Sequence, residues 1–267
     1  MKALSAALIL LLSAVSWAPA QNRTLTIAAT TSIEDSGLFA ALLPKFESRS
    51  GIKVQVLSRA SSAALATAVR GEADVVIVNN AEALDRFVSA GNGARRQPLM
   101  YNDFIIAGPA ADPARLAGTR DAPAALRTIA RLRVAFVSRA DESGTHVTER
   151  RLWSIAGVDP KSRSGGWYRE AGMGMGATVE MAARLGAYVL TDRATWLAHR
   201  VADQRVIVEG DPRLFDQYEI AVRKPATNRA AADSFVDWLI SAEGQDAIAA
   251  FRIDGVQAFI PNAKPTN

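Results

Sequence analysis

Residues 25–91, which decide the fold, read LTIAATTSIEDSGLFAALLPKFESRSGIKVQVLSRASSAALATAVRGEADVVIVNNAEALDRFVSAG. Three strand-like runs alternate here with three segments of helical spacing (25–29, 38–49, 52–57, 61–69, 73–78 and 81–90). The third run is continuously apolar, which is typical of a strand buried on both faces of a parallel sheet. This alternation of strand and helix predicts an α/β fold.

A second series of strands and helices follows residues 98–109, a long strand-like segment between prolines. Two such series, joined by two strands, predict two lobes with a cleft between them. We expect residues 22–103 and 217–267 to build the first lobe and residues 104–216 to build the second. Ligands in open α/β sheets bind beyond the carboxyl ends of the strands, and sites between lobes are common.

The first twenty residues have the order of a secretory signal peptide. Met1 and Lys2 give a positive start, residues 3–15 form an apolar run, and small residues follow at Ala18 and Ala20. The run is shorter than the roughly 20 residues that a permanent membrane anchor needs. We therefore expect residues 1–20 to be removed on export.

The composition narrows the classes of function. The chain has no Cys and only two His, so disulfides are impossible and a transition-metal site is not expected. The net charge is +4, and the basic residues are spread along the chain, which argues against a nucleic-acid partner. A mild positive charge suits the capture of a small anion.

Hydroxyl-bearing residues follow the first predicted strand. Thr30, Thr31 and Ser32 offer three adjacent hydroxyls just before a helix. A helix start has unpaired N–H donors and a partial positive charge, which favour an anion. The same residue types are also ordinary helix caps, so that alternative stays open here. Asn79, after the third strand, offers an amide for a contact or for a plain turn.

The most specific pattern is SRADESGTH at residues 138–146, which follows another predicted strand. Arg139 offers planar donors that suit an oxyanion, and Asp141 is close enough in sequence to brace it. The next helix opens with two hydroxyls that flank a glycine, at Ser143, Gly144 and Thr145. Glycine lets the backbone come close to a ligand. The alternative is a capping box beside a surface arginine.

Several segments, in this order, resemble the tungstate-binding proteins of bacterial ABC transporters. They are TTSIEDSGL (30–38), ADVVIVNNAEA (73–83), MYNDFIIAGP (100–109), FVSRADESGTH (136–146), GMGMGATVEMA (172–182) and GAYVLTDRATWLA (186–198). The resemblance implies a type II periplasmic-binding-protein fold with one oxyanion in the cleft between its lobes. It implies contacts from two groups of residues, Thr30, Thr31 and Ser32 on one lobe and Arg139, Ser143, Gly144 and Thr145 on the other.

The resemblance also implies a function. We expect the periplasmic solute-binding subunit of an ABC importer, with an inner-membrane permease as its partner and a monomeric state. The expected ligand is tungstate or molybdate, which motifs cannot separate, and we expect no cofactor and no catalysis. A hydrolase would need a nucleophile, base and acid, for which Ser143 and His146 are poor candidates without a Gly-x-Ser-x-Gly turn. A periplasmic anion sensor is an alternative that could use the same site.

The pattern at 139–145 is also similar to a motif of phosphate-binding proteins. Phosphate near neutral pH keeps a proton, which a carboxylate can accept, whereas tungstate, molybdate and sulfate keep none. Since Asn79 follows the third strand and Asp141 is assigned to Arg139, the sequence favours an unprotonated anion. A phosphate- or sulfate-binding protein stays as an alternative, because Glu34 or Asp35 could line the cleft.

Overall fold

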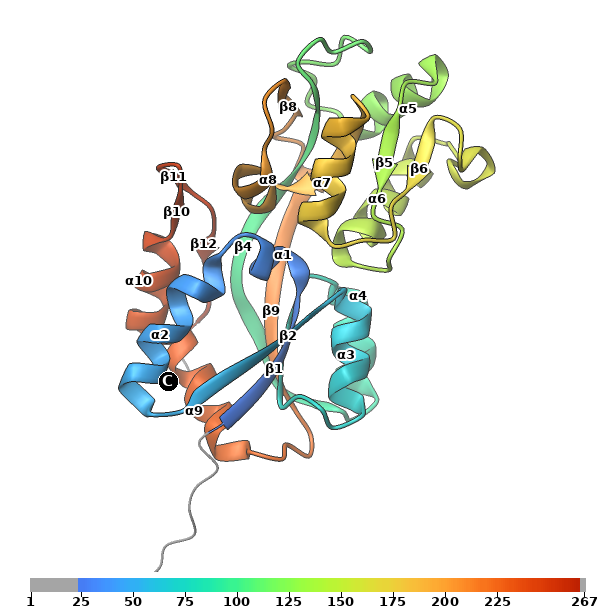
Figure 1. Cartoon of the computed structure of the whole chain (residues 1–267). Helices are drawn as coiled ribbons and strands as arrows, with labels where there is room; N and C mark the ends of the chain where they lie inside the picture. The colour runs from blue at the N-terminus through green and yellow to red at the C-terminus, as the bar shows by residue number, and fades with distance from the viewer. Residues whose placement is uncertain (1–23, 265–267) are drawn as a thin grey trace, which may run out of the picture.

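The computed structural model describes residues 24–264 of the chain, so the predicted signal peptide lies outside the described residues. The molecule has two α/β lobes that long strands connect (Figure 1). One continuous path of strands, in the order β2-β1-β3-β9-β4-β7-β5-β6, runs through both lobes. No helix within residues 24–264 is long and apolar enough to cross a membrane.

The first lobe contains three parallel strands in the order β2, β1, β3. Helices α2 and α9 pack on one face of this sheet, and α3 and α4 pack on the other (Figure 1). The elements that the sequence predicts here are confirmed: β1 (Thr24–Thr30), α2 (Leu38–Ser50), β2 (Lys53–Arg59), α3 (Ser61–Val69), β3 (Val75–Val78) and α4 (Ala81–Ser89). A short helix that the sequence analysis does not predict, α1 (Thr31–Asp35), follows β1 directly.

Two long strands cross between the lobes, β4 (Gly93–Pro109) and β9 (Phe215–Arg223). Strand β4 pairs antiparallel with β9 as far as Asp103, and from Phe104 onward it pairs with β7 (Tyr188–Asp192). Its last residues also pair with β8 (Gln204–Val208), which the sequence analysis misses. Because one strand serves both sheets, its partner switch marks the hinge between the lobes.

The second lobe is a parallel sheet of β7, β5 and β6. Its elements are α5 (Ala122–Leu132), β5 (Phe136–Ser138), α6 (Gly144–Ile155), η1 (Lys161–Arg163), β6 (Tyr168–Glu170), α7 (Met175–Arg184), α8 (Arg193–His199) and η2 (Pro212–Leu214). The chain then returns to the first lobe through α9 (Arg229–Ile240), α10 (Ala242–Ala250), β10 (Arg252–Ile253), β11 (Val256–Gln257) and β12 (Ile260–Pro261). Strand β12 pairs with β4 and so ties the tail to the connecting strand.

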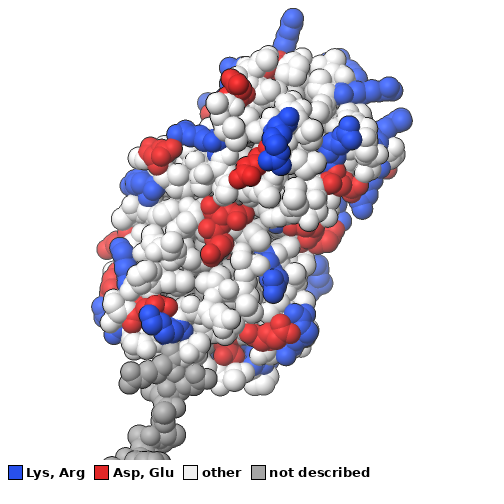
Figure 2. Space-filling view, viewed as in Figure 1, with Lys and Arg blue, Asp and Glu red and all other residues white. Residues whose placement is uncertain are grey.

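Buried apolar side chains cover both faces of each sheet, which accounts for a stable fold without disulfides. In the first lobe, Phe46 packs on Phe235 and Trp238. In the second lobe, the Trp153 ring lies edge-on to Phe136. The charged residues on the face in Figure 2 are of mixed sign, without a clustered basic patch.

The core assignment predicts the cost of truncating Phe46, whose side chain is 1% exposed and lies 5.0 Å from the Phe235 ring. We expect Phe46→Ala to lower the free energy of unfolding by about 3–5 kcal/mol, because it leaves a cavity. The control Val69→Ala removes a side chain that is 55% exposed and should change it by about 0.5 kcal/mol at most. Equilibrium unfolding in urea measures both, and equal effects would contradict the assignment of Phe46 to the core.

Candidate anion site between the lobes

Three hydroxyls gather where β1 ends and α1 begins. Thr30 is the last residue of β1, and Thr31 and Ser32 form the first turn of α1. Thr30 and Ser32 are fully buried, and the hydroxyl oxygens of all three residues are buried without a hydrogen-bond partner among the described residues. Buried polar groups are nearly always paired in folded proteins, so three adjacent exceptions point to a ligand.

Arg139 follows β5 in the second lobe, and its side chain is 1% exposed. Its Nη2 donates to the Asp141 carboxylate, which confirms the predicted brace, while its Nε and Nη1 have no partner among residues 24–264. The Asp141 carboxylate also accepts from the Ser143 N–H at 3.2 Å. The guanidinium is therefore fixed on one edge and leaves two N–H-bearing nitrogens for another acceptor.

The twelve-residue helix α6 begins at Gly144, a short turn after this arginine. Ser143 is its N-cap, and the Ser143 hydroxyl accepts from the His146 N–H at 3.2 Å. The Thr145 hydroxyl is buried without a partner in the described part of the chain. The first N–H groups of a helix lack intrahelical acceptors, so this turn supplies donors and a partial positive charge.

Asn79 and Gly144 meet where the lobes touch. The Asn79 amide accepts from the Ser61 hydroxyl at 2.9 Å and donates to Asp216 Oδ1 at 3.0 Å, so protein groups already engage both of its ends. A Cβ on Gly144 would lie 2.3 Å from Asn79 Oδ1. Glycine is therefore required at residue 144 by the approach of the opposite lobe.

Further contacts join the lobes around the site. The Ser62 hydroxyl donates to the Glu142 carbonyl at 3.1 Å, and the Gly176 N–H donates to Asp35 Oδ2 at 3.0 Å. Asp35 therefore reaches the boundary, but a backbone donor already holds it, whereas Glu34 is exposed. These contacts describe a closed arrangement of the two lobes.

The loop before α7 contacts both groups of predicted site residues. The Gly172 N–H donates to the Arg139 carbonyl at 2.9 Å, which places this loop beside the arginine. Two residues later, a Cβ on Gly174 would lie 3.8 Å from the Thr31 hydroxyl oxygen. The loop thus links the segment that carries Arg139 to the hydroxyl cluster of the first lobe.

Comparisons with known proteins agree with this architecture. Residues 16–243 match the family described as the PBP superfamily domain. The tungstate-binding protein TupA of Peptoclostridium acidaminophilum is 38% identical over 90% of this chain and 86% of its own length. The solved structure of TupA from Desulfovibrio alaskensis G20 superposes with a TM-score of 0.75, at 37% identity, over 90% of this chain and 99% of that one. The tungstate ABC transporter structure from Geobacter sulfurreducens gives a TM-score of 0.77, at 39% identity, over 85% and 98% of the two chains.

The chain belongs to the family of these tungstate-binding proteins, within the PBP superfamily. This membership confirms the resemblance and the two-lobed type II periplasmic-binding-protein fold that the sequence predicts. The relatives named here are a tungstate-binding protein and a tungstate ABC transporter structure. The individual anion contacts of Thr30, Thr31, Ser32, Asn79, Arg139, Ser143, Gly144 and Thr145 stay a prediction.

Two buried acids near the site are not among the predicted site residues, Asp192 at the end of β7 and Asp216 in β9. The sequence suggests an ion pair of Asp192 with its neighbour Arg193, but Arg193 pairs with Asp103 and Glu209 instead. Their side chains are 0% and 2% exposed. Burial raises the pKa of Asp192 to about 6 and raises the pKa of Asp216 well above its usual range. Asp192 follows a predicted strand, as the predicted anion-binding residues do, and this position is the one feature of the sequence that could have identified it.

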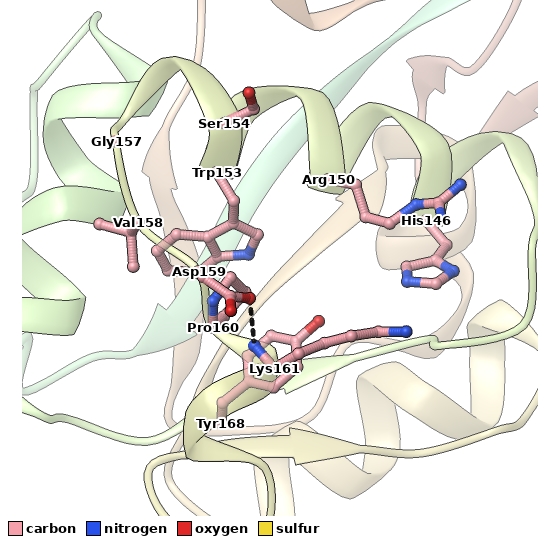
Figure 3. Close-up of a pocket in the computed structure, with 10 residues that line it drawn as sticks. All are labelled: His146, Arg150, Trp153, Ser154, Gly157, Val158, Asp159, Pro160, Lys161 and Tyr168. Atoms are coloured by element: carbon pink, nitrogen blue, oxygen red, sulfur yellow. Dashed lines mark hydrogen bonds between the residues drawn. The ribbon is translucent and has the colours of Figure 1, made fainter.

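A separate cavity of about 400 Å³ lies against α6 and the turn before η1 (Figure 3). His146, Trp153, Lys161 and Tyr168 are among its lining residues, whereas no predicted anion-binding residue lines it. His146 Nδ1 accepts from the Glu142 N–H at 3.1 Å, and burial lowers the pKa of His146. The Ser143 hydroxyl is bonded to the backbone of His146 and not to its ring, which gives no nucleophile and base pair.

The close contact of Gly144 with Asn79 predicts that adding one methyl group at residue 144 hinders closure of the lobes. Gly144→Ala places its Cβ 2.3 Å from Asn79 Oδ1 and 2.5 Å from the Asn79 carbonyl oxygen, so the closed form should be destabilised. We expect binding of tungstate, the anion of its relatives, to weaken by about 1–3 kcal/mol. Small-angle scattering with saturating tungstate should also show a larger radius of gyration than the wild type has.

The matched control is Gly174→Ala at the same boundary, where the nearest atom to a new Cβ would be 3.7 Å away. That distance is an ordinary contact, so this variant should close and bind as the wild type does. A Gly144→Ala protein that closes normally would show that the lobes do not meet as described.

Proposed function

We propose that this protein is the periplasmic solute-binding subunit of an ABC importer that captures tungstate, and also molybdate, between its lobes. One observation carries the proposal: buried donors that have no partner among residues 24–264 lie on both sides of the lobe boundary. They are the hydroxyls of Thr30, Thr31, Ser32 and Thr145 and two guanidinium nitrogens of Arg139. The donors form the outline of a site for a small oxyanion, whose oxygens are all acceptors.

The balance of charge suits a dianion without a proton. Arg139 is the one basic side chain in this set of donors, and Asp141 already offsets part of its charge. The remaining donors are neutral hydroxyl and N–H groups, so the negative charge of the ligand is shared among many hydrogen bonds. In a site closed to water each charge-assisted bond is stronger than it would be in solvent.

Capture follows from the hinge geometry. In our proposal residues 22–103 with 217–267 form one lobe, residues 104–216 form the other, and the anion first meets Thr30, Thr31 and Ser32. Closure then brings Arg139 and the start of α6 onto it, while Ser143, Gly144 and Asn79 shape the boundary. The contacts of Ser62 with Glu142 and of Asp35 with Gly176 support a stable closed form. A permease in the inner membrane would recognise that form, with the protein acting as a monomer.

The proposal disfavours phosphate and catalysis. A site for protonated phosphate needs a carboxylate acceptor, and the two acids that the sequence places beside the predicted contacts, Asp35 and Asp141, each already hold a protein donor. Catalysis needs an activated nucleophile, and Ser143 is not bonded to an imidazole. We therefore assign binding without turnover, with no cofactor, and a periplasmic anion sensor stays the second use of the same site.

Isothermal calorimetry on the chain from Gln21 onward tests the ligand class. Tungstate, molybdate, sulfate and phosphate are titrated separately at neutral pH in a buffer without oxyanions. We expect tight binding of tungstate, equal or weaker binding of molybdate, and no heat from the other two. Binding of phosphate or sulfate alone would assign the protein to the uptake of that anion. No heat of binding from any of the four anions would refute the ligand class.

Substitutions of the charged donor and of a hydroxyl donor should weaken tungstate binding to different extents. Arg139→Ala should weaken tungstate binding by about 2–5 kcal/mol, since the anion loses its charged partner in a dry site. Thr145→Val keeps the shape but loses one hydroxyl, and should cost about 1–3 kcal/mol. Calorimetric affinities measure both changes.

Arg151→Ala is the control, since Arg151 is an exposed arginine on the same helix, α6. It should change the binding free energy by about 0.5 kcal/mol at most, because exposed charges contribute little. Wild-type affinity in Arg139→Ala would show that Arg139 does not bind the anion. Wild-type affinity in Thr145→Val would show the same for the start of α6.

A further inference from the structure

Three polar side chains lie side by side at the hinge, one on each of three neighbouring strands. Asp216 of β9 is opposite Asn102 of β4, and Asp192 of β7 is opposite Phe104, two residues further along β4. Asp192, Asn102 and Asp216 are 0%, 6% and 2% exposed. These three residues, here called the hinge acid cluster, occupy the point where β4 changes partners between the lobes.

The hydrogen bonds of the cluster leave its charge unbalanced. Asp216 Oδ1 accepts from Asn79 Nδ2 at 3.0 Å, while Asp192 Oδ1 accepts from the Thr195 N–H at 2.8 Å and from Asn102 Nδ2 at 3.4 Å. The Oδ2 atoms of both acids are buried without a donor among residues 24–264. Ionising both buried carboxyl groups would cost a large free energy, because each has an oxygen without a donor. The cluster is therefore more stable when one of the two acids is protonated.

The cluster touches both sides of the proposed anion site. Thr195 connects the cluster to the first lobe, because its N–H donates to Asp192 Oδ1 at 2.8 Å and its hydroxyl donates to the Ser32 carbonyl at 3.5 Å. On the other side, the positive charge of Arg139 acts on Asp192 and favours its ionised form. A change in the charge around Ser32 and Arg139 should therefore change the pKa of the acids in the cluster.

Other charged groups face the cluster from its surroundings. The charges of Asp103 and Asp192 both act on Asp216 and raise its pKa further, after burial. Asp103 pairs with Arg193, which lies beyond it and also pairs with Glu209. Arg139 is thus the basic group that holds Asp192 toward its ionised form.

We propose that the hinge acid cluster is a proton site coupled to anion capture, in which Asp192 takes up a proton as the dianion binds. The inference rests on the proposed function. Before binding, the free charge of Arg139 favours an ionised Asp192. The dianion then neutralises Arg139 and brings two negative charges close to the cluster. Protonation of Asp192 removes the repulsion, leaves both acids neutral and allows the lobes to close over the anion.

The sign of the pH dependence follows from linkage. If the bound form holds more protons than the free form, affinity must rise as the pH falls and weaken as it rises. Burial raises the pKa of Asp192 to about 6 in the described arrangement of the lobes, so we expect the effect above pH 6, where the carboxyl group has lost its proton unless the anion raises this pKa further. One coupled proton changes the affinity by at most about tenfold per pH unit.

Calorimetry of tungstate binding at pH 7.5, in buffers of different ionisation enthalpy, counts the protons directly. We expect the wild type to take up about one proton per anion, and its Kd to weaken by about three- to tenfold per unit between pH 7 and pH 9. Asp192→Asn keeps an oxygen for the Thr195 N–H but carries no charge. Its proton uptake should fall close to zero, and its Kd should stay constant over the same range.

The Asp192→Asn variant should therefore bind more tightly than the wild type at pH 9, which damage to the fold would not produce. Asp216→Asn tests the partner acid: its raised pKa already keeps Asp216 neutral, so this variant should still take up about one proton per anion. Asp237→Asn, at a side chain that is 61% exposed on α9, is the control and should take up as many protons as the wild type.

The outcomes separate this inference from the function on which it rests. No binding of tungstate by the wild type would overturn the proposed function. Tight binding with no proton uptake and a constant Kd would overturn the inference alone, and this needs no variant. Uptake that is unchanged in Asp192→Asn would place the proton on another group, such as Asp216, His146 or Glu149, and would also overturn it.

Discussion

A buried guanidinium with one braced edge and two free N–H-bearing nitrogens is the feature on which the rest of the site depends. Arg139 is 1% exposed, and an arginine loses a large hydration free energy when it is buried this deeply. Asp141 recovers part of that loss, and the remaining donors are without an acceptor in the described chain. In the proposed function a dianion completes the set, because it supplies the charge and the acceptor oxygens that residues 24–264 do not provide.

The fold holds this incomplete group at a movable boundary. Strand β4 belongs to the sheets of both lobes, so the three hydroxyls after β1 and the arginine after β5 are carried by bodies that share one hinge. The close approach of Gly144 to Asn79 shows how tightly the two bodies fit when they meet. Asp192 and Asp216 lie on the strands that pair with β4 where it changes partners, so the buried acids are at the junction of the two lobes.

Local patterns in the sequence predict most of the longer strands and helices of both lobes, because these have a strong periodicity and end in a glycine or polar cap. The hydroxyls at 30–32 and the pattern at 139–145 follow predicted strands, where α/β folds place their ligands. The two buried acids could not be predicted in this way. Asp192 and Asp216 become neighbours only through β4, which pairs with both of their strands, and their environment depends on packing between distant segments. Strand β8 was missed for a similar reason, since it is short and its pairing with the end of β4 is not local.

The most direct test of the site is a crystal structure of the protein grown with tungstate, with data collected at the tungsten absorption edge. Tungsten scatters anomalously, so its position is found without reference to the shape of the pocket. The account predicts one strong peak between the hydroxyls of Thr30 to Ser32 and the group formed by Arg139 and Thr145. A peak elsewhere, for instance in the cavity beside His146 and Lys161, with none between the lobes, would contradict it.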